Sequence, residues 1–593
     1  MCGIFGYKGT RDNASEIVVE GLKRLDYRGY DSWGVGVATG SELSVQKQVG
    51  KISEVHDGMH FPSAHTAIAH TRWATTGAVT QANAHPHMSA DGSFILAQNG
   101  IVENFSELKK SLREKGYEFK SETDTEVIVR LIEEVSKTES PFLEAIRQAF
   151  LQLEGRNTII ILTKEGEIYA ARNGSPLVAG LDSHTGDIFL SSDTLSFAAQ
   201  ADQMVVIENN QLVKVGTDQK LELFDAKTGA SCSYKWEPIN ISTGTIDKEG
   251  FDHFMAKEIH ETPSVIKQIV HQDRTKMTQL AEAVKNAHQV YVVGCGTAGF
   301  AAYQTAFYLR VFGKVNAISL IGADVLSYYP LFQKGDLIIA PSQSGETADV
   351  IEVLEYAKKI GMQIASLVNM PGSMMTRMSD FPFMCNAGPE ICVMSTKVFS
   401  SQITWGYLLA KTVQGKYEEG RENLTRLSDE IEKYLTDGEK LQQVQDLAAL
   451  IASREHIFLL GKYQNFAVMS EGMVKIVEAS YKHAHAIQAG DLKHYAITLM
   501  EKGIPVIVAV SEDEVKNDVM TAINEVRLRG AEVIAIASKK EDNFDHFLHV
   551  ADTGETSALF NVIPLQLLAY YLAVALGNNV DKPRNIAKSV TVK

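Results

Sequence analysis

The residue best suited to covalent chemistry is a cysteine at the second position of the chain. Cys2 follows Met1, and a small side chain at this position permits removal of the initiator methionine. The α-amine that this exposes has an ordinary pKa of about 8, so it can take a proton from the adjacent thiol at neutral pH. The pattern predicts one residue that is both nucleophile and base. From these residues alone, an ordinary buried thiol at the start of a strand is an equally good explanation.

Five segments downstream of Cys2 carry residues that could bind or polarise a substrate. Each has a structural explanation when taken alone: Arg72 as a surface charge, Asp124 as a helix N-cap, and Asn99 with Gly100 as a hairpin turn. As an ordered series the segments resemble the glutaminase domain of N-terminal-nucleophile amidotransferases, over about the first 220 residues. The segments are LDYRGYDSWG (25 to 34), HTRWATTG (70 to 77), NAHPH (83 to 87), QNGIVEN (98 to 104) and ETDTEV (122 to 127).

This resemblance implies a role for each of those residues. Cys2 would attack the side-chain amide of glutamine, and the Asn99 side chain with the Gly100 backbone N–H would form the oxyanion hole for the tetrahedral intermediate. Arg72 would hold the α-carboxylate of glutamine, a task that suits a bidentate guanidinium, and Asp124 would hold the α-ammonium.

Trp73 and Thr75 complete the implied glutamine site, and Trp73 would also gate the passage along which ammonia leaves. An indole is large enough to block a channel, although a tryptophan flanked by arginine and alanine more often serves packing. Two positions depart from the family, which usually has histidine where this chain has Thr76 and Gln98. The sequence therefore leaves glutamine affinity and loop closure open.

A polar turn later in the chain has the composition of a phosphate site. The segment SQSGET (342 to 347) follows an apolar strand expected at 337 to 340 and opens a helix expected to begin near Ala348. Hydroxyl groups and free backbone N–H groups at a helix N-terminus bind anions such as a phosphate monoester. A turn of this kind is also a common helix cap, so the segment alone does not decide between the two.

A lysine and a glutamate stand three residues apart in a strongly apolar segment. Lys475 and Glu478 would share one helix face, which alone indicates an exposed ion pair. The neighbours Val474, Ile476 and Val477 make the helix apolar nearly all round, which predicts that it is buried. Buried charge requires a partner or a function.

Further segments extend the resemblance to nearly the whole chain. Together with the glutaminase segments they resemble the glucosamine-6-phosphate synthase family. The resemblance implies transfer of ammonia from glutamine to fructose 6-phosphate and isomerisation of the product to glucosamine 6-phosphate, the first step of amino-sugar synthesis. The matching segments are GCGT (294 to 297), SQSGET (342 to 347), STK (395 to 397), KIVE (475 to 478), DLKH (491 to 494) and PRNIAKSVTV (583 to 592).

The implied sugar chemistry needs a carbonyl activator and a base. Lys588, in the C-terminal tail, would form a Schiff base with C2 of the sugar. This requires a neutral amine, and hence a pKa lowered by burial or by nearby positive charge. Glu478 would move a proton between C1 and C2, with Lys475 as its partner.

The implied acid or base for ring opening is His494, which the residues alone do not distinguish from His483 or His485. Two departures leave sugar affinity open, because Ala298 replaces a usual serine and Tyr495 follows His494 where the family has glycine. The residues that would line the sugar-phosphate site are Thr297, Ser342, Gln343, Ser344, Thr347, Val393 and Ser395.

The elements that must position these residues fall into three domains. Short β-rich runs mixed with amphipathic helices indicate an α+β domain, which the resemblance specifies as an αββα N-terminal-nucleophile glutaminase domain. The polar segment 236 to 252 is the best linker candidate. Stretches that begin at Val290 and at Ile457, 167 residues apart, resemble each other. In both, an apolar strand leads through a turn into a helix, which predicts two α/β doubly wound parallel-sheet sugar isomerase domains.

The predicted boundaries follow from these patterns. They are a glutaminase domain over 2–220, a linker with connecting helices over 221–280, a first sugar isomerase domain over 281–420, a second over 445–583, and an active-site tail over 584–593.

Composition limits the partners. A net charge of -16 disfavours nucleic acid and anionic membranes. The five cysteines show no C-x-x-C spacing, which argues against zinc or a disulfide scaffold and suits a reducing cytoplasm. The apolar stretch 559 to 576 is interrupted by polar residues and proline, so we expect a buried helix rather than a membrane span. No metal or organic cofactor is expected, and the resemblance implies a homodimer or higher homo-oligomer.

Two other functions stay open at this stage. Thr76, Ala298 and Tyr495 would suit an amidotransferase of the same architecture that acts on a different sugar phosphate. A regulatory sugar-phosphate binding protein with a decayed glutaminase would require several catalytic positions to be missing, and they are present.

Overall fold

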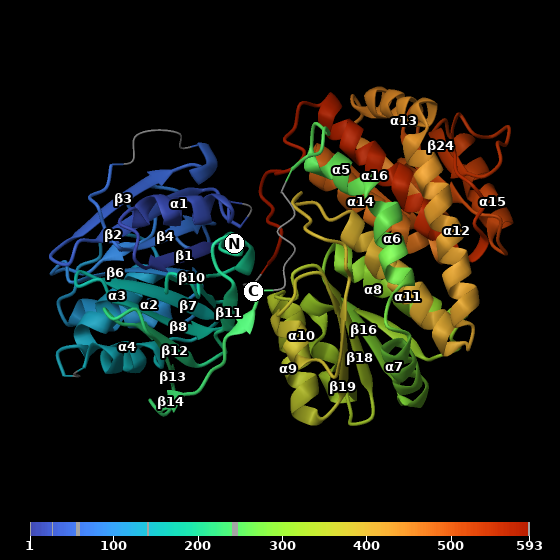
Figure 1. The fold of residues 1–593 in the computed structure, drawn as a ribbon. Coiled ribbons are helices and arrows are strands. Elements are labelled where there is room, and N and C mark those ends of the chain that lie inside the picture. Colours follow the sequence, from blue (N-terminus) through green and yellow to red (C-terminus); the bar gives the residue numbers. More distant parts are fainter. Residues whose placement is uncertain (1, 27, 55–59, 139–140, 240–246, 591–593) are drawn as a thin grey trace. The chain divides into compact units, whose positions relative to one another are not determined.

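The computed structural model describes residues 2–26, 28–54, 60–138, 141–239 and 247–590. The chain divides into two compact units (Figure 1). Unit 1 comprises Met1–Thr245 with Ser589–Lys593, and unit 2 comprises Ile246–Lys588.

Unit 1 is built on two antiparallel sheets. In the described residues the first has the order β15 (Glu237–Pro238), β11 (Gln203–Val206), β9 (Val178–Leu181), β10 (Ile188–Ser191), β1 (Gly3–Lys8), β4 (Thr66–Arg72), β2 (Ser32–Ala38) and β3 (Leu43–Val49). The second has the order β14 (Ser231–Cys232), β13 (Leu221–Asp225), β12 (Gln211–Val215), β8 (Ile168–Asn173), β7 (Asn157–Thr163), β6 (Phe94–Gly100) and β5 (His87–Met88).

The strands of unit 1 are apolar on both faces because each sheet is covered on both sides. Successive side chains of a strand point to opposite faces. Ile4 therefore packs between the two sheets with Ile160, while Phe5 packs on the outer side with Val18 and Leu22. The covering helices are α1 (Ala14–Lys23) on one sheet and α2 (Phe105–Glu114), α3 (Asp124–Val135) and α4 (Phe142–Phe150) on the other. This is the predicted αββα arrangement, which is confirmed.

The first unit continues beyond the boundary predicted at residue 220. The strands β13, β14 and β15 lie in the segment expected to be linker and connecting helices, yet they pair with strands of the two sheets. They are only two to five residues long. Such short strands among polar residues carry too little alternation to be recognised from sequence.

Unit 2 contains two five-stranded parallel sheets with the same topology. Their orders are β17 (Ala317–Ile321), β16 (Val290–Gly294), β18 (Leu337–Ser342), β19 (Gln363–Val368) and β20 (Phe381–Met384), and β22 (His483–Gln488), β21 (His456–Gly461), β23 (Pro505–Val510), β24 (Glu532–Ala537) and β25 (His546–His549). In each copy the first strand lies between the second and the third, an order of the doubly wound folds. The predicted duplication is confirmed.

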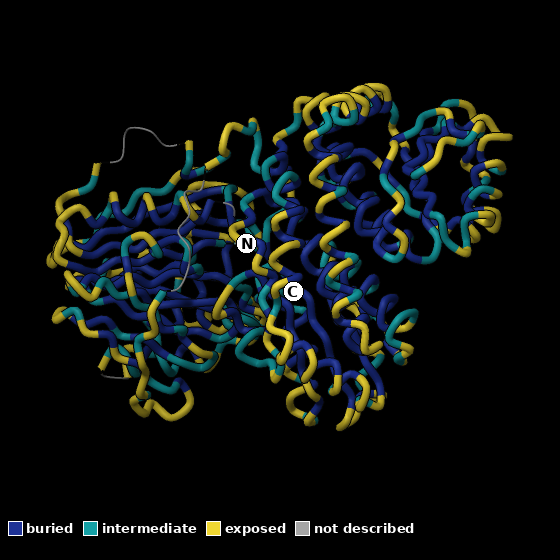
Figure 2. The backbone as a smooth tube through the Cα atoms, turned by 45° about the vertical axis from the view of Figure 1, so that its right-hand side comes forward, coloured by how far each residue is buried: buried dark blue, intermediate teal, exposed yellow. Residues whose placement is uncertain are grey.

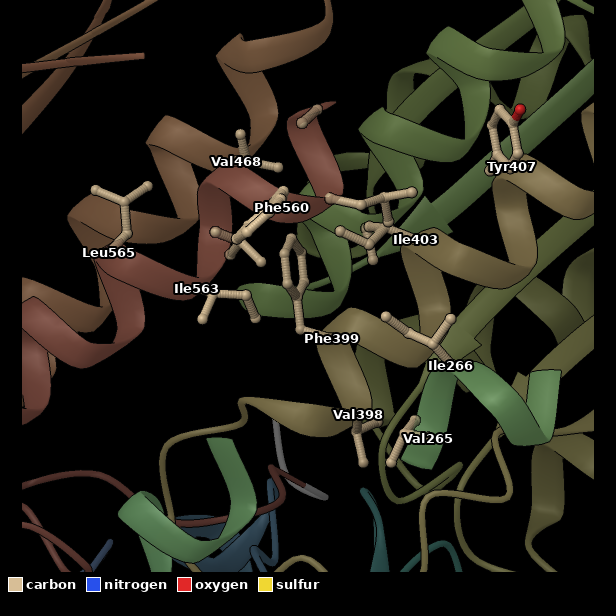
Figure 3. Packing of buried hydrophobic residues seen from close by; sticks show 14 of the residues in the cluster. Val265, Ile266, Val398, Phe399, Ile403, Tyr407, Val468, Phe560, Ile563 and Leu565 are labelled. Atoms are coloured by element: carbon tan, nitrogen blue, oxygen red, sulfur yellow. The ribbon is translucent and has the colours of Figure 1, made fainter. Parts of the chain in front are cut away.

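Helices enclose these sheets and form one large core between them (Figure 1, Figure 3). They are α5 (Phe254–His260), α6 (Thr262–Val270), α7 (Arg274–Asn286), α8 (Thr297–Val311), α9 (Ala348–Ile360), α10 (Met374–Met378), α11 (Lys397–Val413), α12 (Tyr417–Thr436), α13 (Gly438–Ile451), α14 (Phe466–Ser480), α15 (Lys516–Arg527) and α16 (Ser557–Ala575). In Figure 2 the exposed residues gather along outer helices and turns, and the buried ones inside.

The helix α16 is the centre of that core. In the labelled view of Figure 3, Phe560 and Ile563 from α16 lie beside Phe399 and Ile403 from α11. The segment Gly554–Ala575 is long and apolar enough to cross a membrane, but 83% of its most apolar 18-residue window is buried inside the structure. The prediction of a buried helix here is confirmed.

Removing an aromatic ring from this core measures how much the core contributes to the stability of unit 2. Phe560 is 1% exposed, so Phe560→Ala should destabilise unit 2 by about 3–5 kcal/mol through lost burial and a cavity. Val574, on the same helix, is 41% exposed, and Val574→Ala should change stability far less. Urea unfolding followed by a fluorescence probe measures both. Equal losses would contradict the central position of α16.

Candidate active sites

Cys2 lies directly before β1, and its thiol contacts the backbone that follows β4. The Trp73 N–H donates to Cys2 Sγ at 3.3 Å, and Sγ lies 3.6 Å from the Trp73 carbonyl oxygen. Pairing of Gly3 with Thr71 between β1 and β4 brings the two segments together. Burial raises the pKa of the Cys2 thiol, so it needs a base before it can act as a nucleophile.

The Arg72 guanidinium, at the end of β4, holds the loop that follows. It donates to the carbonyl oxygens of Thr76 at 2.6 Å, Gly77 at 3.1 Å and Ala78 at 3.1 Å. Three of its five N–H groups are engaged in this way. The loop thus curls around the guanidinium, and Thr75 is exposed on it.

Trp73, the first residue of that loop, is half-buried. Its indole meets the Tyr30 ring edge to face, with 5.5 Å between ring centroids. This contact positions the indole against Tyr30, while the Trp73 backbone contacts the thiol. The predicted gating role of Trp73 is not tested by this geometry.

The predicted oxyanion hole lies at the end of a strand rather than in a hairpin turn. Asn99 and Gly100 are the last residues of β6, where they pair with Thr158 and Asn157 of β7. Gly100 has φ +132°, and a Cβ there would lie 2.0 Å from the Arg156 carbonyl oxygen. Only glycine fits at this position.

A histidine orients the Asn99 amide. His70 Nε2 lies 2.9 Å from the Gln98 carbonyl oxygen and 3.1 Å from Asn99 Oδ1. Because a carbonyl oxygen only accepts, Nε2 carries the proton and donates to both oxygens. Asn99 Nδ2 is buried without a partner among the described residues, so it is a donor available to a developing oxyanion.

Two more buried histidines, His85 and His87, lie in a row with His70. The rings of His70 and His85 are 4.3 Å apart between centroids, and those of His85 and His87 are 5.2 Å apart. Burial lowers the pKa of His70 to about 3 and those of His85 and His87 well below their usual range. All three rings are therefore neutral at physiological pH. His85 Nε2 bonds to Thr125 and His87 Nε2 to Thr123.

Gln98, which stands where the family usually has histidine, takes part in this hydrogen-bond network. Thr125 Oγ1 donates to Gln98 Oε1 at 2.5 Å, and Gln98 Nε2 donates to Asn157 Oδ1 at 2.7 Å. Both polar atoms of the side-chain amide are thus paired. The glutamine replaces the usual histidine without leaving a buried polar group unsatisfied.

Asp124 is the first residue of α3, and the N-cap is Thr123, whose side chain accepts from the Glu126 N–H. The carboxylate of Asp124 instead accepts from the Val102 N–H at 2.8 Å. Burial raises the pKa of Asp124. Cys2, Arg72 and Asp124 interact electrostatically with one another, so the fold brings these three predicted residues together.

The predicted phosphate turn lies at the carboxyl edge of the first sheet of unit 2. Ser342 ends β18 and accepts from the Gly345 N–H at 2.9 Å, and the helix α9 begins at Ala348 as predicted. Thr297 begins α8 just after β16. Ligands of doubly wound sheets bind where the strand order reverses, here between β16 and β18.

A buried lysine joins this edge to the second sheet. Lys475, on α14, is 1% exposed, donates to Thr297 Oγ1 at 3.1 Å and forms ion pairs with Glu478 and Glu471. Burial alone would lower the pKa of Lys475, but the two carboxylates raise it overall. Burial also raises the pKa of Glu471 to about 7. The predicted burial of the helix holds for Lys475, whereas Val477 is 41% exposed.

Lys588 is buried beside a negative charge, not a positive one. Its ammonium pairs with Glu390 at 2.5 Å and donates to the Cys392 carbonyl oxygen at 2.7 Å. Of the two alternatives expected for Lys588, burial or nearby positive charge, the structure shows burial, and the charge beside the ammonium is the Glu390 carboxylate, which stabilises it. Ser395 Oγ donates to the same carboxylate, and the Val393 N–H donates to the Asp581 carbonyl oxygen.

His494 stands apart from these groups. It lies in a short helical turn, Leu492–His494, and its side chain is exposed. In the part of the chain that the structure describes, no hydrogen bond or ion pair joins its ring to Glu478, Lys475 or Lys588. Tyr495 beside it packs against His485.

One cluster has donor atoms for a metal, but it has the features of a surface turn. Atoms of Asp182, His184 and Asp202 lie within 4.8 Å of one another. The carboxylates already accept hydrogen bonds from Ser183 and Thr185. We assign no metal to it.

Sequence reasoning missed three residues of these sites: His70, Glu471 and Glu390. Glu471 stands four residues before Lys475 on the same helix face, and this spacing could have revealed it. His70 lies in the motif that carries Arg72, but its contact with Asn99 depends on strand pairing. Glu390 follows Gly388 and Pro389 in an irregular segment, and no sequence signal indicates its pairing with Lys588.

Comparison with known proteins finds one family match in unit 1 and two matches to a second family in unit 2. The Glutamine amidotransferase domain family matches residues 55–222, and the SIS domain family matches 283–412 and 450–576. Glutamine–fructose-6-phosphate aminotransferases (isomerizing) of Pyrococcus horikoshii and Thermococcus kodakarensis are 35% and 36% identical, with both chains covered over 100% of their length. The C-terminal domain of a glucosamine-fructose-6-phosphate aminotransferase from Francisella tularensis superposes with a TM-score of 0.52. It is 28% identical and covers 57% of this chain and 100% of its own. This chain therefore belongs to the glutamine–fructose-6-phosphate aminotransferase (isomerizing) family.

Proposed function

We propose that this protein makes glucosamine 6-phosphate and glutamate from fructose 6-phosphate and glutamine. The observation that carries the proposal is the buried contact of Lys475 with Thr297, Glu471 and Glu478. It links an anion-binding edge to a carboxylate that can move protons, which is what an isomerase acting on a sugar phosphate requires. The same chain carries a complete glutaminase site in unit 1.

In the glutaminase half, Cys2 Sγ attacks the amide carbon of glutamine. The α-amine, free after Met1 is removed, takes the thiol proton and passes it to the departing ammonia. Asn99 Nδ2 and the Gly100 N–H stabilise the oxyanion, and Arg72 and Asp124 hold the amino-acid end of glutamine. Water then hydrolyses the thioester to glutamate.

In the sugar half, the turn after β18 with Thr297 holds the phosphate. The Lys588 amine adds to the C2 carbonyl and water leaves, which gives the Schiff base. Ammonia then adds to this C2 imine and releases the Lys588 amine, so that C2 carries the new nitrogen as an imine. Glu478 takes a proton from C1 and C2 is protonated, which leaves an amine at C2 and the carbonyl at C1, with Lys475 keeping the carboxylate oriented. His494 serves ring opening.

The location and assembly of the protein are further parts of the proposal. A reducing cytoplasm is supported by the five cysteines, all of which are free thiols. A homodimer or higher homo-oligomer is supported by an apolar patch on the edge strand β17 and the turn after it. The patch comprises Ile318, Ile321, Leu326 and Leu331, which are 37%, 64%, 74% and 62% exposed.

The central test is to incubate the purified protein with glutamine and fructose 6-phosphate and to assay both products by mass spectrometry. We expect glutamate and glucosamine 6-phosphate in equal amounts. Glutamate without amino sugar would indicate another sugar phosphate as acceptor, and failure to form either would contradict the assignment.

A second prediction separates the two sites. Cys2→Ala should lower glutamine hydrolysis by at least about 10³-fold, because the nucleophile is lost, while isomerisation of fructose 6-phosphate to glucose 6-phosphate continues. Cys232→Ala, at the other half-buried cysteine of unit 1, is the matched control and should leave both activities intact. Loss of both activities in a folded Cys2→Ala protein would refute separate sites.

A third prediction concerns assembly. If the patch after β17 is the contact between copies, Leu326→Glu should shift the mass measured by light scattering from dimer toward monomer, because a buried unpaired charge disfavours association. Leu528→Glu is the control, since Leu528 is 86% exposed on another surface of unit 2. An unchanged dimer in Leu326→Glu would place the contact elsewhere, and a monomeric wild type would contradict the assembly altogether.

A further inference from the structure

Three segments far apart in sequence meet around Lys588. The N–H groups of Phe254 and Met255, at the start of α5, donate to the Asp581 carboxylate at 3.1 and 3.0 Å. The Asp581 carbonyl oxygen accepts from the Val393 N–H at 2.9 Å. The helix α5, the 388–396 segment and the tail from residue 580 are thus tied together, and Lys588 lies in that tail.

Glu258, on α5, contributes a second buried carboxyl group to this junction, beside Glu390. It is 2% exposed. Its Oε1 accepts from the Ile391 N–H at 2.5 Å and from the Cys392 N–H at 3.1 Å. Its other oxygen, Oε2, is buried and has no partner among the described residues.

This carboxyl group sets the backbone that holds Lys588. Glu258 fixes the N–H groups of Ile391 and Cys392, and the Cys392 carbonyl oxygen accepts from Lys588 Nζ at 2.7 Å. Without an acceptor at Glu258, two buried N–H groups would lose their partner, which costs free energy in proportion to their desolvation. The segment would then be free to move and to release the lysine.

The charges around Glu258 decide its protonation state. Burial and the neighbouring Glu390 carboxylate raise its pKa to about 8, against the opposing influence of Lys588 and Lys397. Glu390 also loses solvation by burial, but Lys588 together with the N–H groups of Thr396 and Val398 lowers its pKa overall. The Cys392 thiol interacts with both the Glu258 and the Asp581 carboxyl groups. Lys397 is itself paired with Glu261.

One buried ammonium can neutralise only one of the two carboxyl groups. Glu390 makes the ion pair with Lys588, so the remaining proton resides on Glu258. The Glu258 Oε2 atom is buried without a partner in the described part of the chain, and this costs less free energy for a protonated carboxyl group than for a charged carboxylate.

We propose that Glu258 is a positioning residue for the sugar-site lysine: as an uncharged carboxyl it holds the Ile391–Cys392 backbone that aims Lys588 at the substrate. This inference rests on the proposed function, in which Lys588 forms the Schiff base. To react, the Lys588 ammonium passes its proton to the Glu390 carboxylate, which leaves a neutral amine and a neutral acid. The Lys588 amine, held by the Cys392 carbonyl oxygen, then attacks C2. The Glu390 acid returns its proton to the oxygen that was the C2 carbonyl, and this oxygen leaves as water when the Schiff base forms.

The proposal predicts a pH dependence with a definite sign. The pKa of Glu258 in the folded protein, about 8, exceeds its ordinary value of 4.5. The folded state therefore binds the proton more tightly, and stability falls as pH rises from 4.5 to 8. Above that range the added negative charge loosens the segment, so the isomerase rate should fall with a midpoint near pH 8.

The test compares Glu258→Gln and Glu258→Ala in the full chain. Gln keeps a carbonyl acceptor and no charge, so its isomerase rate should stay within about threefold of wild type near neutrality, and the alkaline fall should vanish. Ala orphans two N–H groups, so the isomerase kcat should fall at least about tenfold with a smaller change in KM. Glutamine hydrolysis should not change in either variant. Glu249→Gln is the matched control, at an exposed glutamate paired with Lys257.

The lysine itself provides a direct measurement. Borohydride reduction in the presence of fructose 6-phosphate should attach the sugar to Lys588, detected by peptide mass. Labelling should be near the wild-type level in Glu258→Gln and strongly reduced in Glu258→Ala. If the alanine variant does not fold, the pH profile and the thermal midpoint of Glu258→Gln still test whether an uncharged Glu258 positions Lys588. The midpoint of Glu258→Gln should rise relative to wild type as the pH is raised.

Three outcomes would overturn the proposal. The isomerase rate could fall as far in Glu258→Gln as in Glu258→Ala, or the fall of the rate at alkaline pH could persist in Glu258→Gln. Lys588 could also be fully labelled in a folded Glu258→Ala variant. Failure of the proposed function is recognised separately, because wild type would then form no amino sugar or acquire no label at Lys588.

Discussion

The sugar-binding half of this protein depends on keeping two ammonium groups out of water. Lys475 is 1% exposed and the Lys588 side chain is 4% exposed, and a buried lysine is tolerated only when carboxylates surround it. Glu471 and Glu478 meet this need for the first, and Glu390 for the second. The helices and segments that carry these carboxylates must therefore come together before either lysine can be buried. Burial of these two lysines and packing of unit 2 therefore depend on each other.

The glutaminase unit contains a contrasting buried network, in which three histidine side chains carry no charge. His70, His85 and His87 are neutral because burial lowers their pKa. Neutral rings can stack closely, and each keeps an N–H to donate or a lone pair to accept. The result is a hydrogen-bonded network that orients the Asn99 amide through uncharged rings. In the proposed mechanism, the direction of this donor to the oxyanion then does not depend on the protonation of a histidine at neutral pH.

The sequence indicated the architecture well because periodic patterns and duplication are local signals. Apolar strands followed by helices predicted both parallel sheets, and the ordered motifs predicted which residues the first unit brings together. Contacts across distant segments were not predictable. The pairing of Lys588 with Glu390 joins residues 198 positions apart, and no pattern near either residue indicates the other. The carboxylate partner of Lys588 was not anticipated for this reason, and the short strands β13 to β15 were missed because they carry too few residues to show alternation.

The two sheets of unit 2 have the same topology but have diverged in charge, and this divides their tasks. In the first copy the turn after β18 reads SQSGET, with hydroxyl groups and a glycine at φ +66°. In the second copy the turn after β23 reads SEDE. Three carboxylates at that edge repel a phosphate, and Asp513 among them accepts from the Gln464 amide at 2.8 Å. A duplicated fold would otherwise offer two equivalent phosphate sites. The second copy instead contributes α14, whose Lys475 reaches Thr297 of the first. In the proposed mechanism one copy binds the anion and the other supplies the acid and base groups, which would place the reacting carbons at the junction of the two sheets.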